Sequence, residues 1–232
     1  MTGTFRRLLG AVIGCLLISG TAAAAVQQTP SPPDWERILT DLGLIDVQKV
    51  CGEIQVELKY STPDNFLHQD VYGDLEKCFL VKEAASKLAA AQRSLAGLRP
   101  GWRLKVWDGA RPRRIQTAMW ALVKGTPQQS FVANPATGSI HNYGAAVDLT
   151  LLDEKGRELD MGTPYDFFGD KAQPRLEDEL LKRGVLTPEQ VQNRRFLRKV
   201  MTEAGFIPIS GEWWHFDAFP KEEVRKRFRI IE

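Results

Sequence analysis

Cysteine and histidine are scarce in this chain, which has three of each among 232 residues. No two cysteines have the CxxC spacing of a zinc-binding motif, which excludes a structural zinc site built on such a pair. No segment of about 20 to 50 residues repeats, which excludes a solenoid. Hydrophobic residues make up 43% of the chain and charged residues 26%, ordinary values for a folded protein of one domain.

An excess of one charge is also absent. The chain has 31 Lys+Arg against 29 Asp+Glu, and two of the basic residues, Arg6 and Arg7, lie in an N-terminal leader-like segment. Without that segment, 29 basic residues balance 29 acidic ones. The sequence therefore predicts no nucleic-acid binding, which needs a concentrated basic surface. The basic run RRFLRK at 194–199 is interpreted as the solvated face of a helix.

A hydrophobic run long enough to span a membrane is missing too. The apolar stretch from Leu8 to Ser19 follows two arginines and precedes the small residues Ala22 to Ala25, the pattern of a secretory signal peptide. We expect residues 1–25 to be this signal peptide, the proline-rich residues 26–35 a tether, and residues 36–232 the folded domain. The protein would then be exported, periplasmic or secreted, with no stable membrane span after cleavage.

Two alternatives stay open for the N-terminus: an uncleaved anchor, and lipidation at Cys15 in the stretch VIGC, which loosely resembles a lipoprotein cleavage box. After cleavage at residue 25 only Cys51 and Cys78 remain. Because exported proteins often oxidise such a pair, we expect a Cys51–Cys78 disulfide, with two buried thiols as the alternative.

Apolar periodicity predicts an α+β fold. Helical spacing occurs over residues 35–42, 80–96, 112–123 and 187–204, and the last of these begins with a Thr187 cap followed by proline. Alternation predicts strands at 54–58, 103–107 and 146–153. Helices and strands alternate irregularly, so we expect a single domain with a small central mixed or antiparallel sheet flanked by helices.

The stretch SIHNYGAAVDL, residues 139–149, is the first candidate for chemistry. On the predicted strand Asp148 shares a face with Thr150, and the HNYG turn allows His141 to approach the same point. Both a metal site and an ordinary polar loop fit this spacing.

The stretch EWWH supplies a second histidine and a carboxylate, Glu212 and His215. Two histidines and one carboxylate form a common catalytic zinc set, here His141, Asp148 and His215, which leaves Glu212 free to act as a base. Since positions three apart on a strand face opposite sides, a bend must separate Glu212 from His215 if both serve one site. The alternative is an aromatic core strand with a surface histidine.

The stretch WDGARP places Asp108 and Arg111 at a strand-to-helix junction, a common location for functional side chains. An Asp–Arg pair that only stabilises the turn is the alternative.

Together the motifs resemble one family. The order W-D-G-x-R-P, then S-x-H-x-x-G-x-A-x-D, then E-x-W-H is similar to that of the D-alanyl-D-alanine dipeptidases, within the zinc D,D-peptidases. The resemblance runs from about Val56 to Phe219 and includes KYSTPDNF (59–66), MGTPYDFF (161–168) and NRRFLRKVM (193–201).

The resemblance implies one Zn²⁺ per chain, held by His141, Asp148 and His215. It implies that Glu212 is the catalytic base and that Arg111 stabilises the developing oxyanion. Other divalent ions also suit a ligand set of two histidines and one aspartate.

The resemblance also implies substrate-binding residues. Asp166 matches the position that receives the free ammonium group of the substrate, Ser139 and Tyr60 match positions lining the pocket, and Asp108 orients Arg111. A carboxylate at the substrate's N-terminus favours a dipeptide over a longer peptide. A turn cap at PYDFF is the alternative for Asp166.

The expected function is hydrolysis of a small D,D-dipeptide, D-alanyl-D-alanine, in salvage or turnover of cell-wall dipeptide. A zinc D,D-carboxypeptidase or endopeptidase acting on peptidoglycan stem peptides is the first alternative. A non-catalytic zinc-bearing wall-binding domain is the second.

Overall fold

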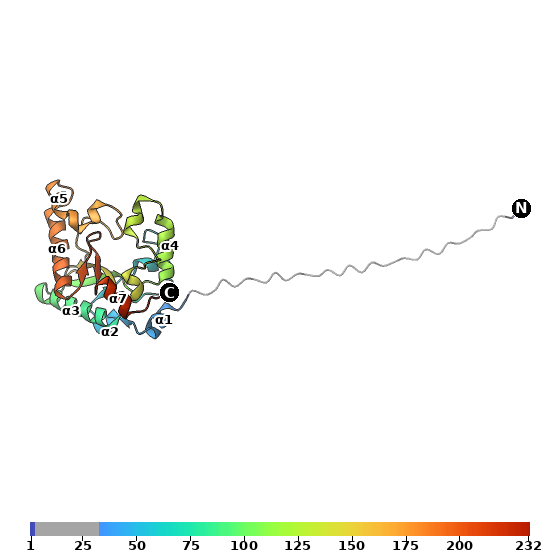
Figure 1. The fold of residues 1–232 in the computed structure, drawn as a ribbon, viewed down its shortest axis with the longest axis horizontal. Helices are drawn as coiled ribbons and strands as arrows, with labels where there is room; N and C mark the ends of the chain where they lie inside the picture. The colour runs from blue at the N-terminus through green and yellow to red at the C-terminus, as the bar shows by residue number, and fades with distance from the viewer. Residues whose placement is uncertain (3–32) are drawn as a thin grey trace. The chain divides into compact units, whose positions relative to one another are not determined.

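The described part of the chain, residues 1–2 and 33–232 of the computed structural model, contains both helices and strands (Figure 1). The helices are α1 (Trp35–Asp41), α2 (Val47–Val50), α3 (Lys82–Leu98), α4 (Arg113–Val123), α5 (Glu177–Lys182), α6 (Pro188–Glu203) and α7 (Lys221–Arg227). The strands are β1 (Ile45–Asp46), β2 (Gln55–Val56), β3 (Phe79–Leu80), β4 (Arg103–Asp108), β5 (Ala146–Leu152), β6 (Ile207–Pro208) and β7 (His215–Asp217).

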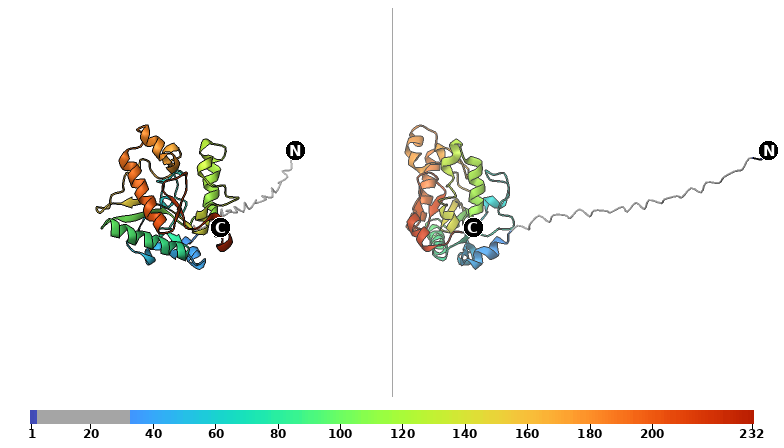
Figure 2. Two further views of the ribbon diagram at one scale, coloured as in Figure 1. Left: turned by 60° about the vertical axis from the view of Figure 1, so that its left-hand side comes forward. Right: turned by 45° about the vertical axis from the view of Figure 1, so that its right-hand side comes forward.

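Five strands form the central sheet in the order β2-β4-β5-β7-β6. The β2–β4 pair is parallel and the other pairs are antiparallel, while β1 and β3 form a separate antiparallel pair. In Figure 1 and the left view of Figure 2, α6 and α4 lie on opposite sides of the central strands. The fold is thus α+β, with a mixed sheet flanked by helices, as the sequence predicts.

The long helices follow the apolar spacing of the sequence. α3 buries Ala84, Leu88 and Leu95 and packs against β4 and α6. α6 begins at its predicted cap, where the Thr187 hydroxyl accepts a hydrogen bond from the Gln190 amide at 3.2 Å and the Gln190 side chain accepts one from the Thr187 amide at 3.0 Å. These reciprocal bonds satisfy two backbone donors at the helix N-terminus.

Several elements differ from the sequence prediction. The strand expected over 54–58 spans only Gln55–Val56, and the short helices α2, α5 and α7 were not predicted. Within the basic run at 194–199, Arg194 is buried rather than solvated, and its Nε donates to the Met161 carbonyl at 2.6 Å. Burial lowers the pKa of Arg194 to about 10.

The expected disulfide between Cys51 and Cys78 is wrong, because both cysteines are free thiols. Cys78 is buried, and its Sγ would lie 2.5 Å from a Cβ added at Gly109. The Cys78 thiol therefore packs against the turn that follows β4 instead of bonding to Cys51.

The N-terminal predictions fall mostly outside the described residues: the signal peptide beyond residue 2, lipidation at Cys15, and the tether up to residue 32. The end of the expected tether belongs to the fold, since Trp35 is buried and begins α1 after the Asp34 cap. Among the helices of residues 33–232, none is long and apolar enough to cross a membrane.

Candidate metal centre

Three neighbouring strands align three of the candidate side chains. Asp148 of β5 is paired with Asp108 of β4 on one side and with His215 of β7 on the other. The β4–β5 register shifts between Val106 and Asp108, and this bulge brings Asp108 opposite Asp148. Side chains from three segments that are far apart in the sequence therefore meet at one point of the sheet.

The fourth side chain, His141, comes from the turn before β5. A short 3₁₀ helix, Ile140–Tyr143, begins with the Ser139 cap and ends at Gly144, whose φ is +64°. A Cβ at Gly144 would collide with the Leu44 side chain, so both the left-handed backbone and the close approach require glycine. The turn brings His141 beside Asp148 near the beginning of β5, as the HNYG sequence predicts.

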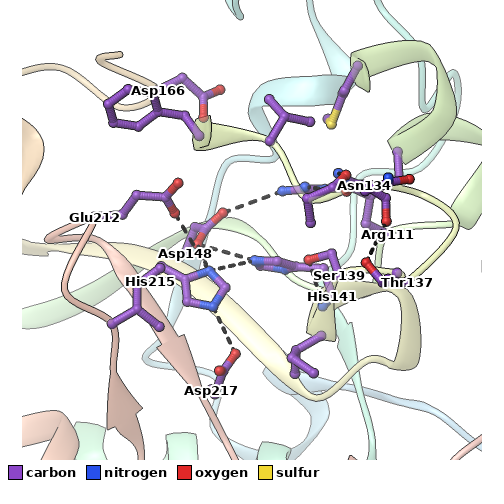
Figure 3. Close-up of a pocket in the computed structure, with 18 of the residues that line it drawn as sticks. Arg111, Asn134, Thr137, Ser139, His141, Asp148, Asp166, Glu212, His215 and Asp217 are labelled. Carbon is purple, nitrogen blue, oxygen red and sulfur yellow. Dashed lines mark hydrogen bonds and ion pairs between the residues drawn. The ribbon is translucent and has the colours of Figure 1, made fainter. Parts of the chain in front are cut away.

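The nitrogen and oxygen atoms of these residues converge. Nε2 of His141 lies 3.1 Å from Nδ1 of His215, and Oδ1 of Asp148 lies 3.3 Å from the first nitrogen and 3.0 Å from the second. All three residues are buried and form the one His/Cys/Asp/Glu cluster with metal-binding geometry in the described part of the chain. Figure 3 shows the two imidazoles and the carboxylate facing one another.

The three inner atoms of the cluster are Nε2 of His141, Nδ1 of His215 and Oδ1 of Asp148. The outer nitrogens of the two imidazoles have hydrogen-bond partners outside the cluster. Nδ1 of His141 lies 2.8 Å from the Gly109 carbonyl, and Nε2 of His215 lies 2.8 Å from the Asp217 carboxylate. A neutral imidazole that donates from its outer nitrogen has a lone pair on its inner nitrogen, and that lone pair is then available to a metal ion.

The short distances among the three inner atoms favour positive charge between them, which a proton or a metal ion can supply. A tetrahedral ion with bonds of about 2.0–2.1 Å spaces its ligand atoms about 3.3–3.4 Å apart, close to the observed distances. Burial lowers the pKa of His215, but hydrogen bonds with Asp148 and Asp217 outweigh it and raise the pKa to about 10. Burial also raises the pKa of Asp148, yet both histidines hold it well below its usual value. These residues fit a divalent metal ion.

Glu212 lies beside the donors rather than among them. The backbone bends at Trp213 and Trp214 before β7 begins, which confirms the predicted bend and turns Glu212 toward the donor cluster (Figure 3). Its Oε2 is 4.0 Å from Nδ1 of His215, longer than the spacing among the three donors. Burial raises the pKa of Glu212 to about 7.

Arg111 is fixed by its neighbours. Its Nε and Nη2 donate to Oδ2 of Asp108 at 2.8 and 2.5 Å, and its Nη1 donates to Gln116 at 3.0 Å. The other oxygen of Asp108 accepts a hydrogen bond from the Tyr72 hydroxyl at 2.7 Å. Nη2 also lies 3.5 Å from Asp148, so the guanidinium borders the metal centre. Asp108 has the predicted orienting position; Gln116 and Tyr72 belong to no predicted motif.

Two further supporting residues were missed by the sequence analysis. Asp217 hydrogen-bonds His215, and the Tyr165 hydroxyl donates to Oδ2 of Asp148 at 2.9 Å. The sequence contains a pattern that indicates the role of Asp217. Residues two apart on a strand share a face, and the stretch HFD places Asp217 on the same face as His215. No sequence pattern indicates the role of Tyr165, apart from its position next to Asp166.

Asp166 and Tyr60 form a second polar pair. The Tyr60 hydroxyl donates to Oδ2 of Asp166 at 2.7 Å, although 106 residues separate them. Burial raises the pKa of Asp166 well above its usual value, against the effect of this hydrogen bond. Asp166 also has a φ of +55°, a strained conformation for a non-glycine residue.

Most of these groups border one cavity of about 350 Å³, whereas Asp108, Tyr72 and Tyr165 do not line it. The predicted site residues that line it are Tyr60, Arg111, Ser139, His141, Asp148, Asp166, Glu212 and His215. Two basic residues of α7, Lys221 and Arg225, line it as well. The structure therefore brings the predicted site together.

Residues 40–230 match the family model described as D-Ala-D-Ala dipeptidase. The chain belongs to the D-Ala-D-Ala dipeptidase family. It is therefore a metallopeptidase, a class of hydrolase whose metal the buried cluster is suited to hold.

Curated members of the D-Ala-D-Ala dipeptidase family are similar over most of their length. A D-alanyl-D-alanine dipeptidase of Escherichia coli K12 is 34% identical over 174 residues, 75% of this chain and 83% of that protein. One from Enterococcus faecium is 28% identical over 193 residues, 76% of this chain and 91% of that protein. A third, from Synechocystis, is 32% identical over 160 residues, 56% of this chain and 65% of that protein.

Proposed function

We propose that the chain is a zinc-dependent dipeptidase that hydrolyses D-alanyl-D-alanine. The relatives bear this activity in their names. The observation that carries the proposal is that one cavity contains both the donor cluster, with Glu212 beside it, and the separate buried carboxylate of Asp166. The first group suits hydrolysis, and the second suits the ammonium group of a short substrate.

In this proposal His141, Asp148 and His215 hold one Zn²⁺. When bound, the ion polarises the scissile carbonyl and lowers the pKa of a water molecule to about 7. Asp217 and the Gly109 carbonyl hold the two imidazoles in the required tautomers.

Glu212 is the general base. Its carboxylate accepts a proton from the water as the water oxygen bonds to the carbonyl carbon. The same proton then passes to the nitrogen of the leaving D-alanine as the C–N bond breaks. Burial raises the pKa of Glu212, which makes its carboxylate a stronger base.

Arg111 stabilises the negative charge that develops on the carbonyl oxygen. Asp108 and Gln116 fix three of its N–H groups, so the guanidinium is preorganised at the edge of the metal centre. Removal of one such donor typically reduces kcat by about 100- to 1,000-fold.

The charges of the cavity suit a zwitterion. Asp166 accepts the substrate's ammonium group, which supplies the positive charge that makes a buried carboxylate favourable. Lys221 and Arg225 provide positive charge for the substrate carboxylate, and Ser139 lines the cavity between the His141 turn and the substrate.

The proposal includes export. Residues 1–25 have the secretory pattern, and residues 36–232 are the enzymatic domain. An exported dipeptidase meets dipeptide released from the cell wall, so we assign it to salvage or turnover of that dipeptide.

The test is hydrolysis of D-Ala-D-Ala beside N-acetyl-D-Ala-D-Ala by purified protein from residue 26 onward with stoichiometric Zn²⁺. We expect cleavage of the free dipeptide only, loss of activity on chelation, and recovery with Zn²⁺. Equal or better cleavage of the acetylated substrate would favour a carboxypeptidase. Zinc binding without cleavage of either substrate would favour a binding domain.

A further inference from the structure

The helix α6 carries a buried charge that the proposed mechanism does not use. Arg194 is 1% exposed, and its Nη1 and Nη2 have no hydrogen-bond partner within the part of the chain that the structure describes. The buried carboxylate of Glu177 is bonded to Arg198 instead. A buried charge without a bonded carboxylate is unfavourable, so stability alone does not account for this arginine.

The one hydrogen bond of Arg194 reaches the segment that carries Asp166. Nε of Arg194 donates to the Met161 carbonyl at 2.6 Å. Met161 begins the segment 161–166, which ends at Asp166 in the wall of the metal-centre cavity. This bond fixes the start of the segment against α6, and a bond from a charged donor is stronger than one between neutral groups.

The guanidinium of Arg194 also contacts the residue that follows Glu212. Its Cζ lies over the ring of the buried Trp213, 5.7 Å from the ring centroid, and a cation is attracted to the face of an indole ring. Nε1 of Trp213 in turn donates to the Thr163 hydroxyl at 2.7 Å. Arg194, Trp213 and the segment 161–163 therefore form a closed circuit of contacts.

We propose that Arg194 is a positioning residue that holds two groups of the reaction at once, Asp166 through Met161 and Glu212 through Trp213. This inference rests on the proposed function, in which Glu212 is the base and Asp166 receives the substrate's ammonium group. Both carboxylates line the metal-centre cavity, as Figure 3 shows, whereas Arg194 does not line it. Arg194 therefore acts only through its two neighbours.

Two substitutions separate the two contacts. The amide nitrogen of Arg194→Gln is as many bonds from the backbone as Nε is, so this variant keeps the bond to Met161 and loses the contact with Trp213. Arg194→Met has a similar length and loses both contacts. Arg195→Met is the matched control, because Arg195 is the next residue of α6, is exposed and pairs with Asp178.

A third substitution reaches the same circuit without changing the buried charge. Thr163→Val removes the acceptor of Trp213 Nε1. It also keeps the experiment decisive if Arg194→Met does not fold. Every variant is measured for its melting temperature, its Zn²⁺ content, its Zn²⁺ affinity in chelator competition, and kcat and KM for D-Ala-D-Ala well below the melting temperature.

We expect the two contacts to appear in different kinetic constants. Arg194→Gln should lower kcat by about 10- to 100-fold with KM unchanged, because only the support of Glu212 is lost. Arg194→Met should lower kcat by the same factor and also raise KM by about 10-fold, because the segment with Asp166 is released. Both variants should bind Zn²⁺ as the parent does, and the Arg195→Met control should match the parent throughout.

The double variant tests whether both contacts act through Trp213. Thr163→Val should lower kcat, and adding Arg194→Gln should then cost less than the product of the two separate effects. Full multiplication of the two effects would refute the circuit.

The outcomes distinguish this inference from the proposed function. A parent that does not cleave D-Ala-D-Ala overturns the proposed function and the positioning role with it. With an active parent, Arg194 variants that lose only thermal stability, or that lose their Zn²⁺, overturn the positioning role alone. Equal KM values in Arg194→Gln and Arg194→Met refute the link from Met161 to Asp166.

Discussion

Replacing Glu212 by glutamine tests whether this residue is a base or a fourth metal ligand. The three donor atoms lie 3.0–3.3 Å from one another, whereas Oε2 of Glu212 is 4.0 Å from the nearest inner nitrogen of His215. Glutamine has nearly the same volume, so the cavity keeps its shape. It also removes a charge that burial disfavours, so we expect no loss of thermal stability.

The expected magnitude follows from the role of a general base. Base catalysis typically contributes about 100- to 10,000-fold, which corresponds to about 2.7–5.4 kcal/mol in the activation free energy. We therefore expect Glu212→Gln to lower kcat for D-Ala-D-Ala by that factor and to bind Zn²⁺ in a 1:1 ratio.

Three measurements check this expectation: D-alanine release for kcat, atomic emission for the metal content, and competition with a chelator for the Zn²⁺ affinity. Glu222→Gln on the exposed side of α7 is the matched control and should retain full activity. A Glu212→Gln protein that loses its Zn²⁺ would make Glu212 a ligand. One that keeps more than about a tenth of the parent kcat would refute its role as the base.

Three other substitutions test the residues that support the site. Asp217→Ala should weaken Zn²⁺ binding about 10- to 100-fold in chelator competition, because His215 loses its 2.8 Å partner; an unchanged affinity would contradict this. Tyr72→Phe removes a hydrogen bond to buried Asp108 and should lower kcat by about 10-fold with little change in KM, which steady-state kinetics can measure. Gly109→Ala should destabilise the fold by about 1–3 kcal/mol in urea unfolding, because its Cβ meets the Cys78 Sγ at 2.5 Å; adding Cys78→Ala should restore part of the loss, and strict additivity would argue against this contact.

The sequence predicts the elements whose apolar pattern is long enough to have a period. The helices α3 and α6 span 17 and 16 residues, and β5 spans seven with alternating core positions. Helix α7 has seven residues and a single fully buried side chain, Val224, so it shows no apolar stripe. Strands of two residues, such as β2 and β6, have no measurable alternation.

The residues of the candidate site also fall into two groups, those that the sequence predicts and those that it does not. His141, Asp148, His215 and Glu212 could be predicted because their residue types and order match a chemical motif. The residues that support them could not, because Tyr72 and Gln116 make their contacts only after distant segments pack together. The disulfide was predicted from export and cysteine number alone, and neither carries information about where the two thiols lie.

The register of β5 positions both its core residues and the candidate metal ligand Asp148. Val147, Leu149 and Leu151 are fully buried and alternate with Asp148 and Thr150 on β5. A slip of one residue would exchange the two buried faces and turn Asp148 away from the metal centre, so the packing of the apolar face holds Asp148 opposite Asp108 and His215.

The specificity residues are not fixed by this register. Tyr60 and Asp166 lie in segments outside the five strands and meet through one hydrogen bond and packed rings. A change at Asp166 can therefore alter which substrates enter while the metal cluster stays in place. This separation explains why dipeptide specificity is the part of the proposed function most open to change by a single substitution.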